Sequence, residues 1–165
     1  MDYNNLDEDY LTIVDNIINN DKFLKLKNYK HHGISRFEHS LKVSYNSYKF
    51  AKKYNLDYKE AAVGGLLHDF FLEENKGIKK RLISIFTHPK KAMNNSSNIF
   101  KVNNKEKNII KSHMFPLNIY IPKYKESWIV SLYDKKVAIS EFILRYGHKL
   151  CHMFNFILIM SINFI

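Results

Sequence analysis

A histidine and an aspartate stand side by side, as His68-Asp69, at the end of a segment that is otherwise small and apolar. Burying a charged carboxylate without a partner costs several kcal/mol, so an aspartate in such a segment needs hydrogen bonds or a cation. His39 and Asp134 each lie beside a row of apolar residues at helical spacing. Nitrogen and oxygen donors of this kind suit iron, manganese, zinc, cobalt or nickel better than calcium. The four side chains therefore predict a site for a divalent metal ion.

The blocks that carry these residues resemble the HD-domain superfamily of metal-dependent phosphohydrolases, whose pattern is a histidine, a His-Asp pair and a final aspartate. Residues 36–43, 65–69 and 134–135 look like the family's blocks, in the family's order and at fitting separations. The resemblance covers about residues 33–141. It implies an all-α fold, a compact helical bundle, and a hydrolase in which metal-bound hydroxide attacks phosphorus.

Some members of that superfamily hold two ions and use two more histidines between the His-Asp pair and the last aspartate. His88 and His113 fall in that interval. The predicted metal ligands are therefore, in chain order, His39, His68, Asp69, His88, His113 and Asp134. The resemblance implies that Asp69 bridges the ions and orients the nucleophile, so Asp69 is the predicted catalytic residue. Whether one or two ions bind, and which metal they are, stays open.

Two basic residues flank the predicted ligands and are predicted to bind substrate. Arg36 precedes His39 by one helical turn, and Lys135 follows Asp134 directly. An arginine can hold a phosphate through paired hydrogen bonds, and a lysine supplies a point charge. The predicted partner is a small phosphorylated compound such as a nucleotide. Bacterial diadenosine-tetraphosphate hydrolases of the HD type have a comparable set of six ligands, so a dinucleotide fits as well.

Two other functions stay open at this point. The same ligand set supports mixed-valence di-iron oxygenases within the superfamily, so oxygen-dependent chemistry is the first alternative. The second is a non-catalytic, basic nucleic-acid-binding module, for which the evidence is a formal charge of +10, from 26 Lys and Arg against 16 Asp and Glu. Because the lysines are spread along the chain rather than gathered in one block, a nucleic-acid partner is not expected.

The elements that must position these residues are expected to be helices, since only five glycines and three prolines interrupt the chain. Predicted helices cover about residues 6–18, 35–55, 59–70, 104–112 and 127–146. A short helix is expected at 82–86, and Thr87-His88-Pro89 predicts a new helix start, because proline is tolerated in a first turn. Gly64 and Gly65 inside a helix predict that another backbone packs very close.

The 165 residues fit one domain. The apolar stretch at about 148–163 is shorter than the roughly 20 residues of a membrane-spanning helix. We therefore expect a packed helix rather than a membrane span, with a homodimer interface or a membrane-surface segment left open. Cys151, the single cysteine, has no partner for an internal disulfide. A reducing cytoplasm is the expected location.

Overall fold

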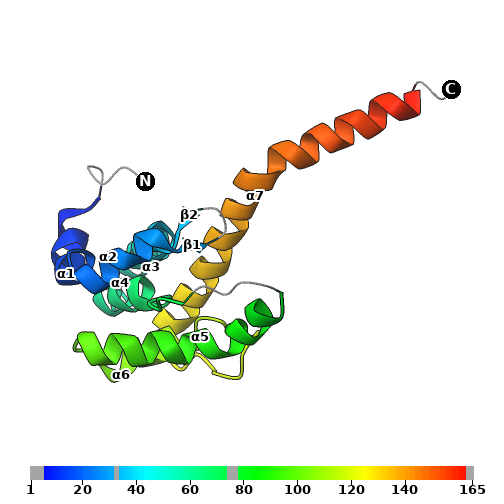
Figure 1. The fold of residues 1–165 in the computed structure, drawn as a ribbon. Coiled ribbons are helices and arrows are strands. Elements are labelled where there is room, and N and C mark those ends of the chain that lie inside the picture. The colour runs from blue at the N-terminus through cyan, green and yellow to red at the C-terminus, as the bar shows by residue number, and fades with distance from the viewer. Residues whose placement is uncertain (1–5, 32–33, 74–77, 163–165) are drawn as a thin grey trace.

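The computed structural model describes residues 6–31, 34–73 and 78–162, and side chains within 6–29, 34–73 and 83–147. Helices dominate these residues, as predicted. Two antiparallel strands of two residues each precede helix α3. The elements are α1 (Glu8–Ile18), α2 (Asp21–Leu24), the 3-10 helix η2 (Lys25–Asn28), β1 (Lys30–His31), β2 (Ile34–Ser35), α3 (Arg36–Lys53), α4 (Tyr58–Leu67), α5 (Ile78–Ile99), α6 (Asn104–Ser112) and α7 (Lys125–Ile162). Figure 1 shows how they are arranged.

Helices α3 and α4 pack closely because α4 presents glycines to its neighbours. A Cβ atom at Gly65 would lie 2.9 Å from the Cα atom of Ser44 in α3. A Cβ atom at Gly64 would lie 2.6 Å from Ile109 Cγ2 in α6. Both distances are shorter than real contacts allow, so only glycine permits this approach. The close backbone packing predicted from the glycine pair is confirmed, and it brings the end of α4 next to α3.

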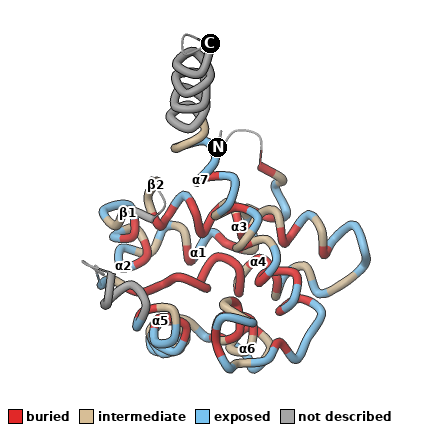
Figure 2. The backbone as a smooth tube through the Cα atoms, turned by 90° about the vertical axis from the view of Figure 1, so that its right-hand side faces the viewer, coloured by how far each residue is buried: buried red, intermediate tan, exposed pale blue. Residues whose placement is uncertain are grey.

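A chain of hydrogen bonds joins α1, α3 and α4 inside the bundle. The Tyr10 hydroxyl donates to Ser44 Oγ (2.8 Å), and Ser44 Oγ donates to the Ala62 carbonyl (2.6 Å). Buried positions lie where the helices face one another (Figure 2). Large apolar side chains such as Phe23, Leu66 and Phe70 fill this core. The core therefore surrounds the segment that carries the His-Asp pair.

Helix α5 differs from the prediction. The sequence predicted a short helix at 82–86 and a new start at Thr87-His88-Pro89, but α5 is one continuous helix with Pro89 inside it. Proline cannot donate the backbone hydrogen bond that a helix interior normally has. In the turn before the proline, the side chains of Thr87 and His88 donate to the carbonyls of Ile83 (3.1 Å) and Ser84 (2.6 Å).

Helix α7 is also longer than predicted. The helix expected at 127–146 and the separate C-terminal helix expected at 148–163 form a single element, Lys125–Ile162, and residue 163 lies outside the described residues. Its C-terminal half leaves the bundle rather than packing on it (Figure 1), and Phe142, Ile143 and Leu144 are exposed. None of the helices in the described residues has both the length and the apolar character that crossing a membrane requires.

Candidate metal centre

His39 is placed by the start of α3. Ser35 caps this helix: its hydroxyl accepts a hydrogen bond from the Glu38 amide, and the Glu38 carboxylate accepts one from the Ser35 amide. This reciprocal arrangement fixes where the helix begins. His39 then lies in the second turn on the side facing α4 and α7, where its side chain is fully buried.

The His-Asp pair directly follows α4. His68 Nδ1 donates to the Gly65 carbonyl (2.7 Å), which orients the imidazole and leaves Nε2 directed away from the helix. Because Gly65 lets α4 approach α3 closely, the ring of His68 lies 5.4 Å from that of His39, measured between centroids. Asp69 is 2% exposed. Asp69 follows an apolar segment in the sequence, and its carboxylate is buried in the structure.

His88 in α5 and His113 after α6 are oriented in the same way as His68. His88 Nδ1 faces the Ser84 carbonyl (2.6 Å), and His113 Nδ1 faces the Ile110 carbonyl (2.8 Å). A carbonyl oxygen only accepts, so each Nδ1 donates its proton to the backbone, and Nε2 is the ring nitrogen that faces the other donors. The two Nε2 atoms lie 2.9 Å apart. A backbone carbonyl bonded to the other ring nitrogen is typical of histidines that ligate metals.

Asp134 and Glu141 lie two turns apart on α7, and both contact His39. His39 Nε2 is 3.1 Å from Asp134 Oδ1, and His39 Nδ1 is 3.1 Å from Glu141 Oε2. Lys42 Nζ lies 3.4 Å from the other oxygen of Glu141. The sequence analysis missed Glu141 as a site residue. Its spacing of seven from Asp134, which puts both carboxylates on one face of a helix, was the available signal.

All six predicted ligands come together. His68 Nε2 lies 3.6 Å from Asp134 Oδ1 and 3.8 Å from Asp69 Oδ2, while Asp69 Oδ1 lies 3.3 Å from His88 Nε2 and 3.7 Å from His113 Nε2. Two sets of three donor atoms are close enough to share an ion. One is His39, His68 and Asp134, and the other is His68, Asp69 and His113.

The donor atoms fit a divalent ion by a second criterion. His68 Nε2 is buried and has no hydrogen-bond partner among the described residues. Burying a polar nitrogen without a partner is costly, and a cation among the surrounding nitrogen and carboxylate donors would provide one. The residues present therefore fit the predicted metal.

The protein environment shifts the pKa values of three of these groups. Burial lowers the pKa of His39, but its hydrogen bonds to Asp134 and Glu141 outweigh burial and raise that pKa to about 10. Burial and the neighbouring His68 and His88 lower the pKa of His113 to about 3. Burial opposes ionisation of Asp134, but its hydrogen bond to His39 and the nearby His68 hold its pKa well below the usual value. Asp134 is therefore a carboxylate and His113 a neutral imidazole, the forms that bind metals.

The two predicted substrate-binding residues make contacts within the protein. The Arg36 guanidinium lies 3.7 Å above the ring of Phe71 and donates to the Phe71 carbonyl. Lys135 Nζ donates to the carbonyls of His113 (2.9 Å) and Ser131 (3.1 Å). Both side chains thus hold segments that carry ligands. Their direct contact with substrate stays a prediction.

Comparison with known families gives one result that matches this geometry. The family model described as HD domain matches residues 36–139, which is more than half of the chain and includes all six predicted ligands. Comparison with curated proteins and with solved structures gave no significant match.

Proposed function

Since this chain belongs to the HD-domain family, whose members are generally metal-dependent hydrolases, we propose that it is a metal-dependent phosphohydrolase acting on a nucleotide or another small phosphorylated compound. The observation that carries this proposal is the convergence of six buried imidazole and carboxylate side chains from five parts of the helical bundle. Divalent ions in such a site activate water and neutralise charge on phosphoryl oxygens.

The chain's own residues divide into two groups around Asp69. In this proposal His39, His68 and Asp134 hold one ion, and His88 and His113 hold the other. Asp69 is placed to serve both, since its carboxylate lies within 3.8 Å of ring nitrogens of His68, His88 and His113. We assign Asp69 the role of holding both sides together and accepting a hydrogen bond from the attacking water. In this proposal Glu141 does not touch substrate; it holds the His39 ring through Nδ1.

The surrounding structure supports an anionic substrate. The chain has a formal charge of +10, and a positive field raises the local concentration of anions. Around the donor atoms the histidine rings pack against one another, with centroids of His68 and His113 4.9 Å apart and those of His88 and His113 5.0 Å apart. Such a preorganised site does not need to rearrange when charge develops on a phosphoryl group.

The test is metal analysis of the purified chain, followed by a panel of nucleotides and phosphate esters with Mn, Fe, Co, Ni or Zn. We expect release of phosphate or a nucleotide that needs the metal and proceeds without oxygen. The variants His68→Ala and Asp69→Asn should abolish it, whereas Asp15→Asn, at an exposed position on α1, should not. Activity that persists in both ligand variants, or that consumes oxygen, would reject the proposal.

A further inference from the structure

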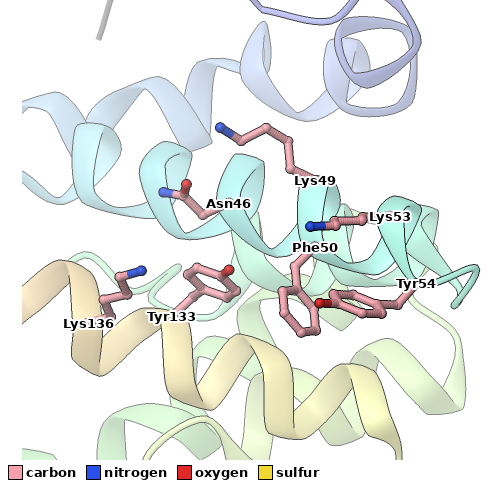
Figure 3. A pocket seen from close by; sticks show the side chains of 7 residues that line it. All are labelled: Asn46, Lys49, Phe50, Lys53, Tyr54, Tyr133 and Lys136. Atoms are coloured by element: carbon pink, nitrogen blue, oxygen red, sulfur yellow. The ribbon is translucent and has the colours of Figure 1, made fainter.

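A pocket separate from the metal centre lies between α3 and α7. It has a volume of about 300 Å³. Its lining residues are Asn46, Lys49, Phe50, Lys53, Tyr54, Tyr133 and Lys136 (Figure 3). None of them is a predicted metal ligand, so this pocket uses other side chains of the two helices that supply His39 and Asp134. Its volume is at the lower end of the range of small-molecule sites.

Three aromatic rings follow one another in this pocket. The ring of Phe50 lies 5.9 Å from Tyr133 and 4.5 Å from Tyr54, measured between centroids. Tyr133 packs on the apolar cluster that contains Val43 and Val137. Tyr54 is 55% exposed, so part of its ring is accessible to a ligand.

The end of α3 fixes the position of Tyr54. The next residue, Asn55, has a φ of 52°, and the Leu56 amide donates back to the Ala51 carbonyl (2.9 Å). These features are those of a Schellman motif, a well-ordered way to end a helix. The exposed ring is thus attached to a rigid turn, which reduces the entropy that binding must overcome.

The charge of the pocket is entirely positive. Lys53 Nζ lies 5.6 Å from the Tyr54 ring, and Lys136 Nζ lies 5.6 Å from the Tyr133 ring. No acidic side chain lines the pocket, and within the described part of the chain neither of these lysines forms an ion pair. Lysines elsewhere differ: Lys52, for example, lies 2.8 Å from Asp9. Unpaired ammonium groups only donate hydrogen bonds, so the pocket selects an anion.

We propose that this pocket binds a nucleoside phosphate, with the base stacked on Tyr54 and the phosphates held by Lys53 and Lys136. Aromatic rings bind bases through their faces, and neighbouring cations bind the phosphates. Asn46 Nδ2 donates to the Lys42 carbonyl (2.8 Å), so its Oδ1 atom is an acceptor that the pocket offers to a base or a sugar hydroxyl. This binding goes beyond the proposed hydrolysis because no residue of the metal centre takes part.

The test is photolabelling of the purified, metal-containing 165-residue chain with 8-azidoadenosine diphosphate, with the labelled residues located by mass spectrometry. We expect label on Tyr54 or Tyr133, protection by ADP, and much weaker protection by adenosine or by inorganic pyrophosphate alone. The variant Lys53→Ala with Lys136→Ala should lower labelling there by about tenfold. The matched control, Lys22→Ala with Lys25→Ala, removes the same charge from exposed residues of α2 and η2 and should leave labelling unchanged.

Labelling also separates this proposal from the proposed function. In the His68→Ala variant, label in the pocket should persist even though hydrolysis is lost. Three results would each overturn the proposal. The first is label confined to peptides of the metal centre, and the second is an equal loss of label in both lysine double variants. The third is protection by pyrophosphate that is as strong as protection by ADP.

Discussion

The Nε2 atoms of His88 and His113 lie 2.9 Å apart, on rings whose Nδ1 atoms both face backbone carbonyls. If both rings are neutral, two lone pairs point at each other, which is repulsive unless a proton or a cation lies with them. Asp69 Oδ1 is within 3.7 Å of both nitrogens. The convergence of these three atoms supports the proposal that both histidines are ligands together with the His-Asp pair.

This relationship predicts the metal stoichiometry. We expect the wild-type chain to bind about two ions, as dinuclear hydrolase sites do, and His88→Ala to bind about one, because only the second ion loses a ligand. The measurement is elemental analysis of protein after dialysis against a limiting chelator. Thr87→Ala is the control, since that side chain is exposed and, among the described residues, its hydroxyl bonds to the Ile83 carbonyl in its own helix. Equal metal content in His88→Ala and the wild type would remove His88 from the site.

Glu141 should control how tightly the site holds its metal. Its carboxylate contacts the ring nitrogen of His39 that faces away from Asp134. Such partners orient a ligating histidine, and losing one typically lowers metal affinity about 10- to 100-fold. We expect Glu141→Gln to lower metal affinity about 10-fold, because its side chain can still accept a hydrogen bond. Glu141→Ala should lower it about 100-fold.

Competition with a fluorescent chelator measures that affinity. The control is Ser140→Ala, at the preceding, exposed position, whose hydroxyl bonds to the Val137 carbonyl (2.8 Å) in its own helix. If Glu141→Ala binds metal as tightly as the wild type, the carboxylate has no part in holding His39.

Arg36→Lys should destabilise the fold although it keeps the charge. The guanidinium stacks on Phe71 and donates to its carbonyl, and the flat group of arginine does both at once, which an ammonium cannot. We expect the free energy of unfolding to fall by about 1 to 3 kcal/mol. Urea unfolding measures this, with Arg145→Lys on the exposed part of α7 as the control. If the free energy of unfolding does not change, Arg36 is not needed for stability, and the predicted contact with substrate is the remaining role of its guanidinium.

The sequence predicted best where a local signal is strong. Residues 104–112 form α6 as expected, because Asn103 and Glu106 make a capping box there. Helix α3 begins as expected after Ser35 for the same reason. The metal ligands were identified through the family pattern, since spacing alone does not say that residues almost a hundred positions apart will meet.

Contacts over long range were not predictable in this way. Glu141 meets His39 across 102 positions, and Arg36 reaches the Phe71 carbonyl across 35. The residues next to Glu141 and Arg36 in the sequence do not indicate which distant residue each of them contacts. The proline in α5 was misread for a related reason, because a Thr-His-Pro sequence suits a helix start and a proline-containing helix interior alike.

The glycine pair in α4 makes a prediction about packing. Alanine normally favours a helix over glycine by about 1 kcal/mol, but a Cβ atom at Gly65 would lie 2.9 Å from the backbone of Ser44. We expect Gly65→Ala to lower the free energy of unfolding by about 1 to 3 kcal/mol, the usual cost of overpacking. Gly147→Ala is the control, because its new Cβ atom would meet only Ile143 Cγ2, at 3.7 Å. If Gly65→Ala is as stable as Gly147→Ala, the close approach is not required.

A pair of glutamates should make stability depend on pH. Burial, together with the nearby Glu60, raises the pKa of Glu106 to about 7 from an ordinary 4.5. Asn103 contacts both carboxylates: its side-chain Nδ2 donates to Glu60 (2.6 Å), and its backbone N–H donates to Glu106 (2.7 Å). The folded chain therefore keeps a proton that the unfolded chain releases, so this group's contribution to stability decreases as pH rises from about 4.5 to 7.

Glu60→Gln removes the neighbouring charge and should weaken this dependence. We expect the variant to be more stable than the wild type by about 1 kcal/mol at pH 8, where Glu106 must ionise, and by much less at pH 5. Urea unfolding at both pH values measures the difference. Asp15→Asn, on exposed α1, removes the same charge and should give a difference that does not change with pH. A Glu60→Gln difference that is equal at the two pH values would mean that Glu60 does not govern the ionisation of Glu106.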